Sequence, residues 1–346
     1  MRIPGLIDPH VHLREPGANH KEDWDTGTAA ALAGGFTAVL AMPNTQPPVT
    51  DRESLDAVYV IAAEKAHCDY AQYLGAGPDN VIDAANAAPG AAGLKLYLDQ
   101  TYGPLRLDEM SLWRPHFNAW PQDRPLVAHA EGRTLAAAIL MSALTDRPLH
   151  LAHVATREEI LLIRTAKERG LKITCEVTPH HLFLTEKDLS GGWGEVRPRL
   201  AAQQDVDALW ENLDVIDCFA TDHAPHTVAE KASETPPPGF PGLETALPLF
   251  LTAVHEGRLT MDNLVARMHT NVRRIFNLPE QPETWVEVDL DAAAEITAST
   301  MQTRAGWTPF EGRKVQGAVR QVVLRGKMVF EDGKVTAPQG FGRRIR

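Results

Sequence analysis

Residues 4–12 read Pro-Gly-Leu-Ile-Asp-Pro-His-Val-His, a short apolar run that ends in two histidines. Further apolar runs of strand length follow along the chain, separated by helix-like segments such as 24–33, 52–66, 133–144 and 157–168. The eight candidate strands cover residues 4–8, 36–42, 70–74, 94–98, 125–128, 150–153, 172–177 and 215–220. This alternation predicts parallel βα units of an α/β protein. Eight units favour closure into a TIM (β/α)8 barrel.

An open doubly wound sheet is the alternative architecture for the same alternation. No G-x-G-x-x-G or Walker pattern follows any of the apolar runs. The nucleotide-binding versions of the open sheet are therefore disfavoured.

The last part of the chain has a different pattern. Two helix-like segments, 243–256 and 261–276, are followed by alternating residues at 286–290, 321–325 and 328–330. The last two alternating segments, separated at Gly326 and Lys327, predict a β-hairpin. We therefore expect a barrel over residues 1–280 and a small β subdomain, formed by residues 281–346 and packed on the barrel.

The composition excludes several classes of protein. With 34 basic and 45 acidic residues, the 346-residue chain has a formal net charge of -11, which disfavours nucleic acid as a partner. No window approaches the ~20 apolar residues of a membrane span, and the amino terminus does not resemble a signal peptide. Cys68, Cys175 and Cys218 show no CxxC spacing, so we expect neither a disulfide framework nor a thiolate zinc site, and a reducing cytoplasm fits best.

Histidines at the ends of the apolar runs indicate a metal centre. His10 and His12 alternate along the first run, so both imidazoles can face one ion. His129 and His153 end the fifth and sixth runs, and Asp222 follows the eighth. In a barrel, these positions open onto the carboxyl-terminal mouth, where active sites of this fold lie. Imidazole and carboxylate are the usual zinc ligands, and the alternative is a set of buried structural histidines.

Lys95 lies inside an apolar run, where an unpaired ammonium is unfavourable and would repel a divalent cation. One interpretation is that its side chain points outward. The other is that the uncharged amine takes up carbon dioxide, which gives a carbamate anion able to bridge two metal ions. Spacing alone leaves both open.

Several stretches of the chain resemble the dihydroorotase family of the amidohydrolase superfamily. They comprise residues 5–17, 41–45, 93–97, 179–182, 221–226, 236–245 and 274–276. The resemblance runs essentially from end to end. The chain looks most like the dihydroorotase domain of the animal multifunctional polypeptide, which also carries carbamoyl-phosphate synthetase and aspartate transcarbamoylase.

The resemblance implies a centre with two zinc ions. One zinc would be held by His10, His12, Asp222 and Lys95 as N6-carboxylysine, and the other by the same carboxylated lysine with His129 and His153. Asp222 would also be catalytic, because it would take a proton from the attacking water and hand it to the leaving ring nitrogen.

The resemblance also implies residues that bind the substrate. Arg14, Asn44 and His226 would bind its carboxylate, for which a guanidinium is the natural bidentate partner. Arg197, Pro238 and Gly239 would contact the pyrimidine ring, and Thr101 and Tyr102 would lie on a flexible loop that closes over the substrate. Without the resemblance, Arg14 could equally form a surface ion pair with Glu15, and Asn44 could be a turn residue.

The implied activity is the reversible cyclisation of N-carbamoyl-L-aspartate to L-dihydroorotate with loss of water, a step of de novo pyrimidine biosynthesis, carried out by a homodimer. One alternative is a cyclic amidase of the hydantoinase or dihydropyrimidinase kind, which needs the same metals but no carboxylate-binding residues. Another is a catalytically inactive relative that serves as an oligomerisation scaffold. The set Arg14, Asn44 and His226 disfavours the first alternative, and the complete ligand set disfavours the second.

Two positions depart from the animal pattern. Ala152 stands where the animal enzymes carry a cysteine that helps to hold an additional zinc with residues matching Glu176 and His181, which argues against a third zinc here. Glu176 and His181 are then expected to orient His153 or its neighbours. Tyr102 stands where the animal domain tends to carry phenylalanine, so the loop gains a hydroxyl.

Overall fold

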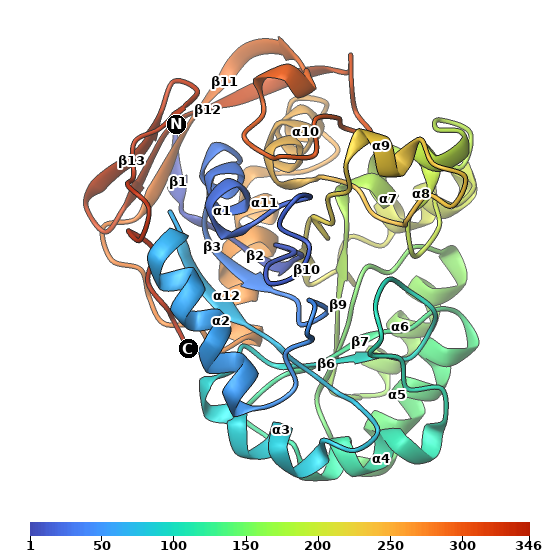
Figure 1. Cartoon of the computed structure of the whole chain (residues 1–346). Helices are drawn as coiled ribbons and strands as arrows, with labels where there is room; N and C mark the ends of the chain where they lie inside the picture. Colours follow the sequence, from blue (N-terminus) through green and yellow to red (C-terminus); the bar gives the residue numbers. More distant parts are fainter.

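The structure, a computed structural model, describes residues 1–346. Its centre is a barrel of parallel strands with helices on the outside (Figure 1). One part of the barrel wall contains β2 (Leu6–Val11), β3 (Phe36–Ala41) and β4 (Asp69–Gln72). The other part runs through β5 (Leu74–Gly75), β6 (Leu94–Tyr97), β7 (Leu126–His129), β8 (Leu149–Leu151), β9 (Ile173–Val177) and β10 (Cys218–Phe219).

Two connections close the barrel. The strands β4 and β5 are halves of one strand that is interrupted at Tyr73, and they join the two parts of the wall. At the other side, Val11 of β2 forms a parallel bridge with His223, and the His12 N–H donates to the His223 carbonyl at 2.7 Å. The wall is continuous, so the predicted TIM barrel is confirmed and the open sheet is excluded. Each predicted apolar run contributes to a strand.

The helices predicted from periodicity are present within one residue of their expected limits, as α1 (Trp24–Ala33), α2 (Arg52–Lys65), α5 (Arg133–Thr145) and α6 (Arg157–Glu168). Two of these helices begin with a capping box. The side chain of Asp51 accepts a hydrogen bond from the backbone N–H of Ser54 at the start of α2, and Thr156 accepts one from Glu159 at the start of α6. The remaining barrel helices are α3 (Val81–Ala87), α4 (Met110–Ala119), α7 (Pro179–Phe183), α8 (Gln203–Glu211), α9 (Val228–Lys231) and α10 (Leu243–His255).

The segment predicted as one helix over 261–276 is divided. It consists of α11 (Met261–Val265), a π-helical turn over Ala266–Thr270 and α12 (Asn271–Ile275). None of the helices combines the length and the apolar character that are needed to cross a membrane.

The carboxyl-terminal strands form a separate antiparallel sheet beside the barrel (Figure 1). Its strands are β11 (Trp285–Glu295), β12 (Lys314–Leu324), β13 (Lys327–Glu331) and β14 (Lys334–Val335), and the amino-terminal β1 (Arg2–Pro4) pairs with β11. The sequence pattern did not predict this contribution of β1. The turn between β12 and β13 lies at Arg325 and Gly326, with φ of 52° and 71°, one residue before the predicted position. Val286 and Val322 of this sheet belong to the same apolar core as Leu6 of the barrel.

Candidate active site

A polar pocket lies at the carboxyl ends of the barrel strands. Tyr97 and Ala224 are the two lining residues that the sequence analysis did not name. The others are His10, His12, Arg14, Asn44, Lys95, Thr101, Tyr102, His129, His153, Arg197, Asp222, Pro238 and Gly239. The structure therefore brings the expected metal ligands and most of the expected substrate residues into one cavity. His226, Glu176 and His181 lie outside its lining.

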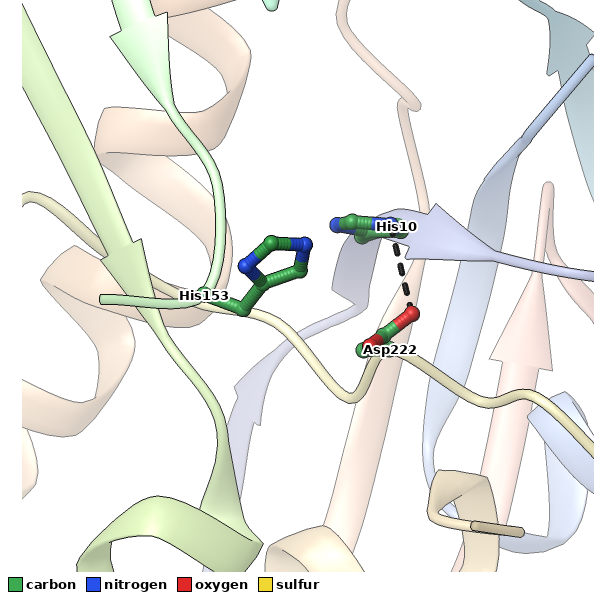
Figure 2. Close-up of side chains that lie close together, drawn as sticks. All are labelled: His10, His153 and Asp222. Carbon is green, nitrogen blue, oxygen red and sulfur yellow. Dashed lines mark ion pairs between the residues drawn. The ribbon is translucent and has the colours of Figure 1, made fainter. Parts of the chain in front are cut away.

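His10, His12 and Asp222 form one side of this pocket. His10 comes from β2 and Asp222 from the loop after β10, and their side chains face each other (Figure 2). Asp222 Oδ1 lies 3.2 Å from His10 Nε2 and 3.1 Å from His12 Nε2. Burial raises the pKa of Asp222, but the imidazoles of His10 and His12 outweigh this effect and hold the pKa well below its usual range. Asp222 is thus an anion at neutral pH.

The side chain of Lys95 points into the barrel. It is fully buried on β6, and its Nζ lies 3.4 Å from His10 Nε2, so the outward-pointing interpretation is excluded. Burial lowers the pKa of Lys95 to about 8, and this increases the fraction of uncharged amine at neutral pH. The carbamate interpretation needs that uncharged amine.

His129 and His153 form the opposite side of the pocket, with His129 Nδ1 2.8 Å from His153 Nε2. Both rings are buried; His153 Nδ1 has no hydrogen-bond partner, and His129 Nε2 lies 3.4 Å from Glu131 Oε1. Burial lowers the pKa of His153 far below its usual value, with a further contribution from His129, and burial lowers that of His12 to about 4. His12 and His153 are therefore neutral, which is the form of imidazole that ligates metals.

The donor set fits a divalent metal ion. His10, His153 and Asp222 (Figure 2) place ligand atoms within 4.8 Å of one another. Buried imidazoles beside a carboxylate, together with a ring nitrogen of His153 that has no partner, are typical of a zinc site and unusual in a structural core. The alternative of buried structural histidines is therefore disfavoured.

Glu176 orients His10. Its Oε1 lies 2.5 Å from His10 Nδ1 and its Oε2 lies 3.1 Å from His150 Nε2. This contact leaves His10 Nε2 directed at the pocket, as in a carboxylate–histidine–metal arrangement. His181 differs, because its two ring nitrogens already contact Thr178 Oγ1 at 2.7 Å and the Pro198 carbonyl at 3.1 Å. Both ring nitrogens of His181 are thus bonded to residues outside the pocket lining.

Arg14 supplies a buried positive charge to the pocket. Its side chain donates to the Pro225 carbonyl at 3.1 Å and lies 3.1 Å from His226 Nε2, and it forms no ion pair with any acidic side chain. The surface pair considered for Glu15 is absent, because Glu15 is bound by Lys65 instead. The guanidinium is therefore available to an anion.

His226 lies behind Arg14 and is fully buried. Its Nδ1 lies 3.1 Å from Lys21 Nζ, and Lys21 also binds Glu230 at 3.0 Å. Burial, followed by the charges of Arg14 and Lys21, lowers the pKa of His226 far below its usual value. His226 is accordingly neutral, and in this structure it supports Arg14 from outside the pocket lining.

Asn44 connects a metal-ligand candidate with the loop that carries Thr101 and Tyr102. Its Oδ1 lies 2.7 Å from His12 Nδ1, and its Nδ2 donates to the Tyr102 carbonyl at 2.9 Å. The Tyr102 hydroxyl accepts from Lys21 Nζ at 3.2 Å, and its ring packs edge-on against His226. The loop therefore lies over the pocket and is attached through both its backbone and its side chain.

The ring-binding candidates come from two other loops. Arg197 donates to the Val196 carbonyl at 3.0 Å and lies 3.4 Å from Glu195 Oε2. Gly239 has a φ of 144°, and a Cβ there would lie 2.4 Å from the Ala224 carbonyl oxygen, so only glycine fits.

Three residues of the site have a strained backbone. Arg14, His153 and Asp222 have positive φ values of 61°, 36° and 46°, which residues with a Cβ rarely adopt. Such strain persists only where the surroundings impose it, and it is typical of functional positions.

Two supporting residues were missed by the sequence analysis. Asp8 accepts from the His10 N–H at 3.0 Å and from Thr221 Oγ1 at 2.5 Å, which ties the two ligand-bearing loops together. Its place beside His10 was a usable signal. Lys21 had no such signal, because its partners are distant in sequence.

Comparisons with known proteins agree with this geometry. A family model described as "Dihydro-orotase-like" matches residues 1–81. The chain is 38% identical over 356 residues to "Dihydroorotase" of Pyrococcus abyssi, covering 98% of this chain and 86% of that protein. The chain belongs to the dihydroorotase family. It is also 56% identical over 349 residues to "Multifunctional protein CAD" of Squalus acanthias, and here all of the chain matches only 16% of the larger protein.

Solved structures related to this dihydroorotase-family chain share its fold. The L-hydantoinase from Arthrobacter aurescens has a TM-score of 0.95 at 25% identity, covering 100% of this chain and 88% of its own. The inactive dihydroorotase-like domain of the Chaetomium thermophilum CAD-like multifunctional protein has a TM-score of 0.87 at 29% identity. The match covers 100% of this chain and 99% of that domain. These two neighbours correspond to the two alternative functions considered from the sequence.

Proposed function

We propose that the chain is a dihydroorotase, which interconverts L-dihydroorotate and N-carbamoyl-L-aspartate in pyrimidine biosynthesis. The observation that carries this proposal is the buried guanidinium of Arg14, which lines the pocket without an acidic partner. A buried cation without a counter-charge is unfavourable, so the pocket favours an anionic ligand. L-Dihydroorotate has a ring carboxylate, whereas dihydrouracil and hydantoin have none.

We infer that two zinc ions are held by His10, His12, Asp222, His129, His153 and the N6-carboxylated form of Lys95. When bound, these ions would acidify a water molecule and polarise the ring carbonyl. The neutral imidazoles and the inward-pointing, readily deprotonated Lys95 support this assignment. The occupied nitrogens of His181, together with Ala152, support two ions and not three.

In the hydrolytic direction, Arg14 binds the substrate carboxylate and so turns the ring amide towards Asp222. The ionised Asp222 carboxylate accepts a proton as the water oxygen bonds to the amide carbon. The carbon–nitrogen bond then breaks, and Asp222 delivers the proton to the leaving nitrogen. The reverse sequence closes the ring and releases water. The loop of Tyr102 would exclude bulk water from this reaction.

We further propose that the chain acts as a homodimer in the reducing cytoplasm. Its cysteines are all buried and unpaired, which suits a reducing compartment. If the chain is part of a fusion, as its similarity to multifunctional proteins allows, carbamoyl-phosphate synthetase and aspartate transcarbamoylase domains would be its partners. Light scattering after size exclusion tests the dimer, and a monomer would refute it.

The deciding experiment measures turnover of L-dihydroorotate, dihydrouracil and hydantoin by zinc-loaded protein in bicarbonate, with Lys95→Ala as the inactive control. We expect turnover of L-dihydroorotate alone. Arg14→Met should raise its KM at least about 30-fold, because removing one partner of a buried charge pair costs ~2–5 kcal/mol. The exposed Arg320→Met is the matched control and should leave KM unchanged.

Two other outcomes favour the alternatives. Comparable turnover of the uncharged rings would indicate a hydantoinase-like cyclic amidase, in accordance with the first structural neighbour. Protein that binds no zinc and turns over none of the three rings would indicate an inactive scaffold, in accordance with the second structural neighbour, the inactive dihydroorotase-like domain.

A further inference from the structure

Lys231 is a buried cation beside the pocket that the mechanism above does not use. It ends α9, and its side chain is almost fully buried, between the rings of Phe240 and Trp307. No acidic side chain forms an ion pair with it. Its ammonium instead donates to three backbone carbonyls, those of Glu195 at 2.8 Å, Pro237 at 3.1 Å and Gly239 at 3.3 Å.

These contacts occupy the ammonium completely. A lysine ammonium has three N–H donors, and Lys231 has three carbonyl acceptors. No donor remains for a substrate, and Lys231 does not line the pocket. Any effect of Lys231 on the reaction must therefore act through the backbone that it binds.

The bound carbonyls belong to the two loops that carry the ring-binding candidates. The 237 and 239 carbonyls bind Lys231, whereas the intervening Pro238 carbonyl lies 3.0 Å from His226 Nε2. The Gly239 N–H donates to the Glu195 carbonyl at 3.0 Å, so Glu195 also joins this segment to the loop of Arg197. The orientation of each peptide group from 237 to 239 is thus set by a buried side chain.

We propose that Lys231 is a positioning residue that holds Arg197, Pro238 and Gly239 in the arrangement that binds the substrate ring. This inference rests on the proposed dihydroorotase function and extends it to a residue outside the pocket. If the ammonium is lost, three buried carbonyls lose a charged donor, and only the bond from the Gly239 N–H to the Glu195 carbonyl still joins the two loops. The metal ligands lie on other segments and keep their contacts.

The test compares holoenzyme variants by steady-state kinetics, zinc content and melting temperature. Lys231→Met keeps the length of the side chain and removes all three donors. We expect its KM for L-dihydroorotate to rise about tenfold or more, because charged hydrogen bonds are lost, while kcat falls less than about threefold and zinc content stays unchanged. Lys231→Gln keeps part of the donor capacity and should give an intermediate KM.

Arg147→Met is the matched control for general destabilisation. Arg147 is also buried and donates to a backbone carbonyl, that of Pro121 at 2.9 Å, but it does not line the pocket. This variant should lower the melting temperature and leave KM unchanged. An equal rise of KM in Arg147→Met would show that the effect of Lys231 is only structural.

The proposal is overturned if the Lys231 variants keep the wild-type KM, or if they lose kcat and zinc together. If Lys231→Met does not fold, the same readouts on Lys231→Gln decide the question. Failure of the proposed function is distinct, because wild-type protein would then not turn over L-dihydroorotate at all. Wild-type turnover with an unchanged KM in the variants refutes only the role of Lys231.

Discussion

Replacing Glu244 with glutamine should change how the stability of the protein depends on pH. Glu244 lies in the first turn of α10, and its two carboxylate oxygens accept from the backbone N–H groups of Gln302 at 2.7 Å and Thr303 at 3.1 Å. Burial raises the pKa of Glu244 to about 7 from its usual 4.5, with a smaller contribution from the charge of Glu22 and a partial offset from the two N–H donors. The carboxylate thus joins the 302–303 segment to the barrel at an electrostatic cost.

The raised pKa of Glu244 determines whether the protein gains or loses stability as pH rises. Well below pH 4.5 the side chain is protonated in both the folded and the unfolded chain, so its stabilising contribution is fully present. As pH rises towards 7, the unfolded chain ionises first and this contribution is lost. The pKa of Glu244 is about 7 in the folded chain and 4.5 in the unfolded chain. At about 1.4 kcal/mol per pKa unit, this difference corresponds to at most about 3.5 kcal/mol. Above pH 7 the loss is constant.

Glu244→Gln removes this titration. Its single carbonyl oxygen can accept only one of the two N–H groups well, so the variant has a fixed cost of ~1–3 kcal/mol at every pH. The difference in free energy of unfolding between the variant and the wild type should still change by about 2–3 kcal/mol from pH 5 to pH 8.5, in favour of the variant at high pH.

Urea unfolding of both proteins at matched metal content measures this difference, and other titrating groups such as Asp8 cancel in it. Glu256→Gln, at the exposed end of the same helix, is the matched control for the loss of a glutamate charge from α10. A Glu244→Gln difference that stays constant between pH 5 and 8.5 would refute the assigned pKa and with it the electrostatic cost.

Two further predictions concern the site. Glu176→Gln gives up one of the two oxygens that bind His10 and His150, so zinc affinity measured by competition with a chelator should weaken roughly 10- to 100-fold; unchanged affinity would show that Glu176 does not orient His10. Tyr102→Phe removes the hydroxyl that accepts from Lys21, so KM for L-dihydroorotate should rise roughly two- to tenfold with little change in kcat. If Tyr102→Phe and the wild type have identical kinetics, the hydroxyl does not contribute to substrate binding.

The barrel and the position of the ligand candidates were predictable from local sequence. A strand of a parallel sheet is marked by its own apolar residues, and the residue that ends it necessarily lies at the carboxyl edge. His10, His129 and His153 could therefore be placed together without knowledge of any contact. The contribution of β1 to the second sheet was not predictable, because three residues carry too little periodicity.

The supporting contacts were not predictable for a different reason. Glu176 and His10 are 166 residues apart, and Lys21 and His226 are 205 apart, so no spacing rule connects them. The residue types also gave no indication, because a lysine between two polar neighbours is usually a solvated surface residue. When such a lysine is buried, its ammonium needs hydrogen-bond acceptors, and only the fold shows where these acceptors are.

The pocket has two electrically distinct ends, and we expect this polarity to favour a ring with a carboxylate over its uncharged relatives. At one end, neutral imidazoles surround the Asp222 carboxylate and the Lys95 amine, an environment suited to metal ions and a proton transfer. At the other end, Arg14 has no acidic partner, and Glu230 beside it is occupied by Lys21. A ring with a carboxylate on one side and an amide on the other satisfies both ends at once. A ring without the carboxylate would leave Arg14 buried and unpaired, and that cost would be part of its binding free energy.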